Sequence, residues 1–177
     1  MTFQQAFERL ERLERELPQR FADAARVAAL DLAASVADRV IETGQSATGQ
    51  RFTPYSTRPM QAWRLWGKSV TQAAEQKVRA LARQKKTLSY AEFRRLNGRP
   101  DNFKNFSFTN AMWRDFGVIS TDALGTKIDV KIGGKTPQAR QKIDENSERE
   151  GRNIIEPSPD ELNAFKTAVL KNALNNV

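Results

Sequence analysis

The stretch WRDFGVISTDALGTKIDVKI, residues 113–132, decides the fold class, because its apolar residues alternate with polar ones. A period of two indicates a β-strand with one buried face. Turn residues at 122–126 divide the stretch, so we expect a β-hairpin with a first strand over 113–120 and a strictly alternating second strand over 127–132. Gly117 is the expected site of a β-bulge. The inward-facing residues of the second strand are Ile128, Val130 and Ile132.

Upstream of the hairpin, the N-terminal part of the chain has helical periodicity. Apolar residues over 3–17 approach a heptad seam, and a second helix is expected over 20–42, because Pro18 breaks or kinks the helix between them. We expect this helix pair to pack on the core. A coiled-coil contact of the first segment with a neighbouring copy is the alternative. The apolar residues of the first segment are Phe3, Phe7, Leu10, Leu13 and Leu17.

Cap signals and apolar spacing place the remaining elements. Ser89 with Glu92, and Ser158 with Glu161, match the capping box, and Thr136 precedes a proline at a helix start. The expected helices cover 60–86, 89–97, 136–150 and 160–175. The last of them places Leu162, Phe165, Val169 and Ala173 on one stripe. Short strands are expected at Phe106 with Phe108 and over 152–156.

These patterns predict the fold class α+β. Residues 1–177 form a single domain in which long N-terminal helices and a C-terminal helix pack on a small antiparallel β-sheet. Within it, residues 1–20 are expected to form an N-terminal helical arm. Residues 43–59, rich in Gly, Ser, Thr and Pro, are expected to form a docking loop.

Composition excludes several classes of site. The chain has no His and no Cys, so it lacks the residues of Ser–His–Asp and Cys–His catalysis, of the usual His-containing zinc sites and of disulfides. It also lacks the glycine-rich phosphate-binding motifs. We therefore expect no enzyme, no catalytic residue, no cofactor and no metal site. A hydrolase that uses paired carboxylates is the one enzymatic alternative that the residues leave open. The acids Asp115, Asp122 and Asp129 are interpreted as solvated charges of the hairpin.

The chain also lacks the signals of membrane and secreted proteins. No apolar run approaches the roughly 18 residues that a membrane helix needs, and the first residues contain acids and no apolar block, unlike a signal peptide. We therefore expect a protein that is made in the cytoplasm and has no membrane partner.

The net charge of +8 comes from one segment, Arg51 to Lys104, which holds thirteen Lys and Arg against three acids. The segment also holds both tyrosines and two of the three tryptophans. Cations mixed with aromatic residues indicate an anionic partner, either nucleic acid or an acidic protein surface. A solvated helix face is the other interpretation.

The candidate site residues all lie in this segment. The expected contacts to a partner or to DNA are Arg51, Arg58, Arg64, Lys68, Lys85, Lys86, Arg94, Arg95 and Arg99. The expected protein-interface residues are Phe52, Tyr55, Trp63 and Trp66, since aromatic residues are enriched where interfaces are strongest. The sequence has no evident basic recognition helix of the helix-turn-helix kind, so any DNA contact is expected to be electrostatic and independent of base sequence.

Four segments, taken in order, carry a resemblance to a known family. They are VIETGQSATGQRFTPYS (40–56), SYAEFRRLNGR (89–99), FTNAMWRDFGV (108–118) and GRNIIEPSPDELNAFKTAVLKNAL (151–174). With the hairpin, their order resembles that of the tail-completion, or head–tail joining and neck, proteins of tailed bacteriophages. One departure is Asn110, which stands where the family pattern has a glycine in the turn that opens the sheet.

The resemblance implies a structural virion protein of the neck or tail. Copies would form a homo-oligomeric ring, commonly hexameric, between the portal or connector and the tail-tube proteins. DNA would pass through its lumen with non-specific contacts. The alternative that the residues leave open is a stand-alone nucleic-acid-binding protein without sequence specificity.

Overall fold

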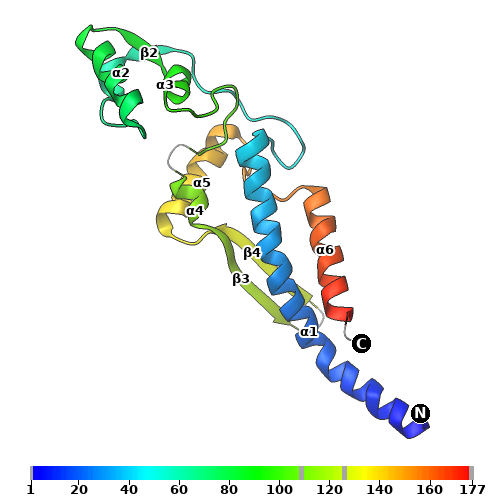
Figure 1. Ribbon diagram of the computed structural model, residues 1–177. Helices are drawn as coiled ribbons and strands as arrows, with labels where there is room; N and C mark the ends of the chain where they lie inside the picture. The colour runs from blue at the N-terminus through cyan, green and yellow to red at the C-terminus, as the bar shows by residue number, and fades with distance from the viewer. Residues whose placement is uncertain (1, 108–109, 125–126, 176–177) are drawn as a thin grey trace.

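The chain adopts an α+β fold built around one long helix. The computed structural model describes residues 2–107, 110–124 and 127–175. Helix α1 (Phe3–Asp38) runs along the body, α6 (Pro159–Leu174) lies antiparallel beside it, and the hairpin of β3 (Phe116–Leu124) and β4 (Lys127–Gly134) packs against it (Figure 1). The other elements are η1 (Arg39–Thr43), β1 (Pro59–Gln61), η2 (Ala62–Leu65), α2 (Gln72–Arg83), β2 (Thr87–Ser89), α3 (Tyr90–Leu96), α4 (Ala111–Arg114) and α5 (Pro137–Glu150).

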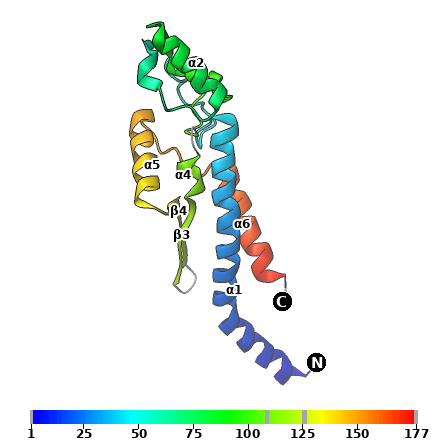
Figure 2. The ribbon, with the colours of Figure 1, turned by 60° about the vertical axis from the view of Figure 1, so that its left-hand side comes forward.

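Helix α1 is continuous, so the prediction of two separate helices is wrong. Of the two expectations at Pro18, a break or a kink, the helix excludes the break. A capping box starts it: Thr2 Oγ1 accepts a hydrogen bond from the Gln5 amide at 3.3 Å, and Gln5 Oε1 accepts one from the Thr2 amide at 2.9 Å. Pro18 lies inside the helix. A proline removes one backbone hydrogen bond while the neighbouring turns keep theirs, so a long helix can bend rather than end. Figures 1 and 2 show α1 bending in its N-terminal part.

The β3–β4 hairpin is confirmed, with two differences in detail. The first strand begins at Phe116, because the preceding residues form the short helix α4. The register shifts between Val118 and Ser120, so the irregularity lies there and not at Gly117, which pairs in register with Gly133. In β4 the expected alternation holds: Ile128, Val130 and Ile132 are partly buried, and the charged residues that alternate with them, Lys127, Asp129 and Lys131, are exposed.

Three other expectations of regular structure are wrong. Residues 60–71 are not helical: β1 pairs with β2, a short 3-10 turn follows, and α2 starts only after the Thr71 cap. Residues 152–156 form no strand; Ile154 is instead fully buried in the core. Phe106 has a φ of 53°, a turn conformation outside any strand. Its expected partner, Phe108, lies outside the described residues.

The turn before α4 has a backbone conformation that favours glycine, the residue that the family pattern has at position 110. Asn110 has φ 57° and ψ 6°, in the left-handed region. Glycine adopts this region at no steric cost, and asparagine is among the few other residues that visit it routinely. The departure from the family pattern at this position is therefore compatible with the turn.

Two apolar clusters hold the body together. In the larger one, Val36 of α1 and Val40 of η1 belong to the same buried cluster as Trp113 of α4 and Phe116 of β3. In the second, the alanines of α1 pack against α6; their small side chains let the two helices approach closely. On α6 the buried stripe contains Phe165, Val169 and Ala173 as expected, but Leu162 is 38% exposed and lies outside it. The alanines in the second cluster are Ala24, Ala25 and Ala28.

Residues 59–97 form a small lobe with an apolar cluster of its own. Leu65, Val78, Leu88 and Phe93 lie in that cluster. The lobe stands beyond the C-terminal end of α1 (Figures 1 and 2). Within it, the predicted α3 is confirmed, including the Ser89 capping box, in which the Ser89 amide donates to the Glu92 carboxylate at 2.6 Å.

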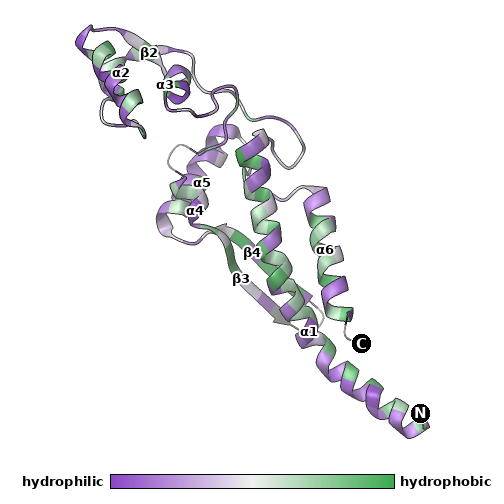
Figure 3. Cartoon of the chain, in the orientation of Figure 1, coloured by the Kyte–Doolittle hydropathy of each residue, from purple (hydrophilic) through white to green (hydrophobic). Residues whose placement is uncertain are grey.

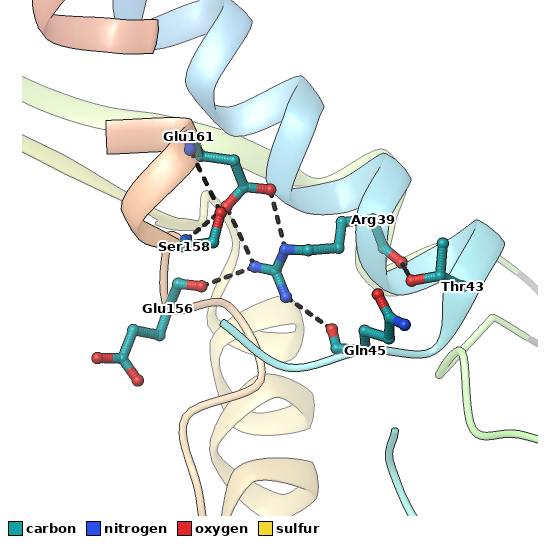
Figure 4. Close-up of polar contacts among 6 residues, drawn as sticks. All are labelled: Arg39, Thr43, Gln45, Glu156, Ser158 and Glu161. Carbon is teal, nitrogen blue, oxygen red and sulfur yellow. Dashed lines mark hydrogen bonds and ion pairs between the residues drawn. The ribbon is translucent and has the colours of Figure 1, made fainter. Parts of the chain in front are cut away.

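An arginine at the end of α1 sets the start of α6. Arg39 Nε donates to Glu161 Oε1 at 2.9 Å, and its Nη1 and Nη2 donate to the carbonyls of Gln45 at 2.6 Å and Glu156 at 2.7 Å (Figure 4). The Glu161 carboxylate also accepts the Ser158 amide at 2.6 Å, which completes the predicted capping box. One carboxylate therefore caps α6 and joins it to α1.

A glycine pair tests the turn after α1. Gly44 has φ 63°, and a Cβ there would clash with the Phe103 ring, whereas Gly49 has φ 78° and open space around it. We expect Gly44→Ala to lower the free energy of unfolding by about 2–4 kcal/mol, from backbone strain plus overpacking. Gly49→Ala, which adds strain alone, should cost about 1 kcal/mol. Chemical denaturation of both variants measures this, and equal losses would contradict the Phe103 contact.

Candidate interaction surface

The basic segment Arg51–Lys104 divides into an internal part and an exposed part. Two of its candidate site residues, Phe52 and Arg94, are 2% and 1% exposed. Residues this deeply buried cannot touch an external partner, so the prediction of contact roles for these two is wrong. The physical reason differs in the two cases.

Arg94 is buried because its guanidinium meets acceptors from a loop that follows it. Nε donates to the Pro100 carbonyl at 2.7 Å, and Nη2 donates to Asn105 Oδ1 at 2.8 Å. The guanidinium also lies over the Tyr55 ring, 4.0 Å from its centroid. Hydrogen bonds and ring contact together compensate for the loss of water around the charge. Arg94 therefore holds the loop over 100–107 and the Tyr55 segment against the small lobe.

Phe52 is buried because the loop over 43–59 docks on its own chain. Its ring meets Phe106 edge-on, with centroids 5.0 Å apart, and belongs to the main core cluster. Tyr55 is half-buried, and its hydroxyl donates to Asn105 Oδ1 at 3.3 Å. Burial raises the pKa of Tyr55, and the nearby Arg94 charge offsets only part of that shift. Both aromatic residues join the loop to the rest of the molecule.

A buried carboxylate fixes the same loop to α5. Glu150 has a side chain only 1% exposed, and Lys104 Nζ donates to its Oε1 at 2.6 Å. The Thr53 amide donates to Glu150 Oε2 at 3.1 Å, and the Thr53 hydroxyl donates to Oε1 at 2.9 Å. Burial alone would raise the pKa of Glu150, but the Lys104 ammonium and the Thr53 donors hold it below its ordinary value of 4.5.

The exposed part carries two tryptophans with cations over them. Trp63 and Trp66 are 60% and 46% exposed. The Arg64 guanidinium lies 5.6 Å from the Trp63 ring centroid, and that of Arg79 lies 5.6 Å from the Trp66 ring centroid. We call the set Trp63, Arg64, Trp66, Lys68 and Arg79 the Trp–cation surface. Exposed tryptophans beside arginines are the residue types that dominate strong protein interfaces.

The other candidate cations differ in their exposure and in whether they form an ion pair. Arg95 is exposed and pairs with Asp101, the Nη2–Oδ2 distance being 2.5 Å, and Arg99 is half-buried. Within the described ranges, six candidate cations are exposed and make no ion pair: Arg51, Arg58, Arg64, Lys68, Lys85 and Lys86. Cations without a carboxylate partner leave a positive field at the surface that can attract an anionic partner.

Among the residues that the structure describes, no group of three or more Asp and Glu side chains is arranged to hold a metal ion. None of the described helices is both long enough and apolar enough to cross a lipid bilayer. Comparisons with protein-family models, with curated proteins and with solved structures found no match to this chain.

Substitutions of two adjacent arginines, one buried and one exposed, test whether the segment Arg51–Lys104 has a structural part and a surface part. Arg94→Ala removes the hydrogen bonds to Pro100, Asn105 and Ser107 and takes a donor from buried acceptors, so we expect a loss of about 2–4 kcal/mol in the free energy of unfolding. Arg95→Ala removes an exposed ion pair and should cost less than about 1 kcal/mol. Denaturant titrations of both variants decide the matter. Similar losses for the two would show that Arg94 is not a buried structural residue.

The pH dependence of stability tests the Glu150 contacts. Because the folded state lowers the pKa of this carboxyl group, its stabilising contribution is present above pH 4.5 and is lost as the pH falls through the folded pKa. We expect Glu150→Gln to lower the Tm near neutral pH and to converge with the wild type in acid. Glu148→Gln, an exposed change on the same helix, is the control. If the Tm difference between Glu150→Gln and the wild type did not vary with pH, the lowered pKa of Glu150 would be contradicted.

Proposed function

We propose that this chain is a structural subunit of a tailed-bacteriophage neck or tail, where copies form a ring through which DNA passes. The class comes from the resemblance of the ordered segments between residues 40 and 174 to tail-completion and head–tail joining proteins. In this role the chain carries out no reaction. Its partners are further copies of itself, the portal or connector, and the tail-tube proteins, and its place is the virion.

The observation that carries the proposal is that large apolar side chains are exposed at both ends of an elongated chain. At one end the Trp–cation surface exposes two tryptophans, and exposed apolar patches of this kind often mark protein interaction sites. At the other end the start of α1 exposes apolar residues on a helix that extends past the body (Figure 2). A subunit that meets neighbours on two sides needs such an arrangement.

The distribution of charge fits the same role. Figure 3 shows the small lobe as mostly hydrophilic, in contrast to the apolar middle of α1 and the hairpin. The exposed cations of this lobe could line a DNA path or meet acidic residues of a neighbouring subunit. Aromatic residues among them favour the protein neighbour, since cations alone are sufficient for phosphate contact.

Light scattering and electron microscopy test the proposal. We expect the chain to form closed rings, alone or together with portal and tail-tube proteins from the same source. We expect Trp63→Ser with Trp66→Ser to weaken binding to those proteins without lowering stability, because both side chains are exposed. Gln72→Ser with Gln76→Ser, two exposed and uncharged residues of the same lobe, is the control. A strict monomer under all these conditions would contradict the ring.

The unpaired cations favour a second candidate, a stand-alone protein that binds nucleic acid without sequence specificity. This candidate predicts micromolar or tighter binding of the free monomer to random duplex DNA in an electrophoretic shift assay. The affinity should fall by about 10³-fold or more between about 50 and 200 mM salt. Weak binding by the monomer at low salt would eliminate this candidate and leave the ring proposal standing.

A further inference from the structure

The first turns of α1 expose an apolar face. Phe3, Phe7 and Leu10 are 89%, 54% and 64% exposed. We call residues 3–17 the arm. The spacing of three and four residues places these side chains on one side of the helix. Aromatic and leucine side chains gathered in this way lose contact with water favourably when another surface covers them.

Further along α1, the same apolar stripe is covered by the body. From Phe21 onward it packs against α6 and the β4 end of the hairpin, where Val169 and Ile128 lie. One continuous helix therefore carries one continuous stripe, covered in its middle and uncovered in the arm. The surface that covers the middle is built from α6 and β4.

The surface formed by α6 and β4 also contains an unfilled hollow. An apolar hollow of about 300 Å³ lies between α1, β4 and α6. Beside it on α6, Leu170 and Leu174 are 52% and 50% exposed. A hollow of this volume can take aromatic side chains. Its lining residues are Ala25, Ile128, Phe165, Lys166, Val169 and Leu170.

The arm cannot fill the hollow of its own chain. Phe7 and Ala25 lie in one helix, and at 1.5 Å per residue they are separated by about 27 Å along its axis. Figures 1 and 2 show the arm pointing away from the body and from α6. Two apolar surfaces of one chain are thus uncovered and unable to meet within that chain.

We propose that the arm of one copy docks in the α1–β4–α6 hollow of a second copy through Phe3, Phe7 and Leu10. Charge supports a second copy as the occupant. The arm carries four Glu and three Arg, a net charge of −1, whereas the whole chain is +8. A slightly acidic arm is attracted to a basic copy of the chain, and it has no excess positive charge to offer the phosphates of DNA.

The contact joins two different patches, so each copy gives an arm and receives one. Such head-to-tail contacts close into a ring when the rotation between copies allows it. The inference rests on the proposed ring and deepens it by naming the surfaces that meet. It also differs from a coiled coil between two arms, which would join identical patches.

Two variants with equal charge change separate the surfaces. The arm variant is Phe7→Glu with Leu10→Glu, and the hollow variant is Leu170→Glu with Leu174→Glu. All four side chains are at least half exposed, so both variants should fold with the wild-type circular dichroism spectrum and Tm. The control is Gln4→Glu with Arg12→Gln, which makes the same charge change on the exposed polar side of the arm.

Light scattering over a range of concentrations gives the first result. We expect the wild type and the control to form oligomers and each of the two variants to be monomeric. Mixing the arm variant with the hollow variant should then give a one-to-one heterodimer and nothing larger. The mixture retains one intact arm that can meet one intact hollow.

Three results would overturn the inference. Oligomers that persist in both variants would show that copies meet elsewhere, and the ring proposal would survive. A monomeric arm variant with an oligomeric hollow variant, and no heterodimer on mixing, would show that arms pair with each other. If the wild type alone stays monomeric, the proposed contact between the arm of one copy and the hollow of another does not form. The ring itself fails only if the wild type also stays monomeric with the portal and tail-tube proteins.

Discussion

The ion pair between Arg39 and Glu161 is the contact on which the arrangement of the body depends. The two residues are 122 positions apart, and their side chains are 14% and 11% exposed. Arg39 also binds the Gln45 and Glu156 carbonyls, so its charge is almost fully hydrogen-bonded within the protein. A buried pair of this kind adds more to geometry than to stability, because desolvation offsets much of the attraction. It places the start of α6 against the end of α1.

With α6 held at the end of α1, the other contacts of the body are packing contacts along α1. The alanines of α1 allow α6 to approach closely, and the hairpin packs against the same helix. The arm remains outside, because α6 ends before it reaches that part of α1 (Figure 1). The hollow and the uncovered arm are thus both consequences of one long helix that is covered along only part of its length.

The basic segment shows how one residue type takes different roles. Arg94 lies in the interior with backbone and side-chain acceptors around it, and Arg95 lies at the surface beside Asp101. Lys104 forms an ion pair with the buried carboxylate of Glu150. The segment has a strongly positive sum of charges, but only part of that charge is presented to solvent. The exposed remainder is a set of tryptophans and cations and not a uniform basic patch.

The sequence by itself determined the features that depend on near neighbours. The caps at Ser89, Thr136 and Ser158 and the alternation over 127–132 were predicted correctly, because each involves groups within a few residues of one another. Trp63 and Trp66 are exposed, as a residue must be to take part in an interface. The tertiary structure alone decided where charges and aromatic residues go. Arg94 and Phe52 are buried because their partners, Asn105 and Phe106, come from a distant loop, and no local pattern records a contact of that range.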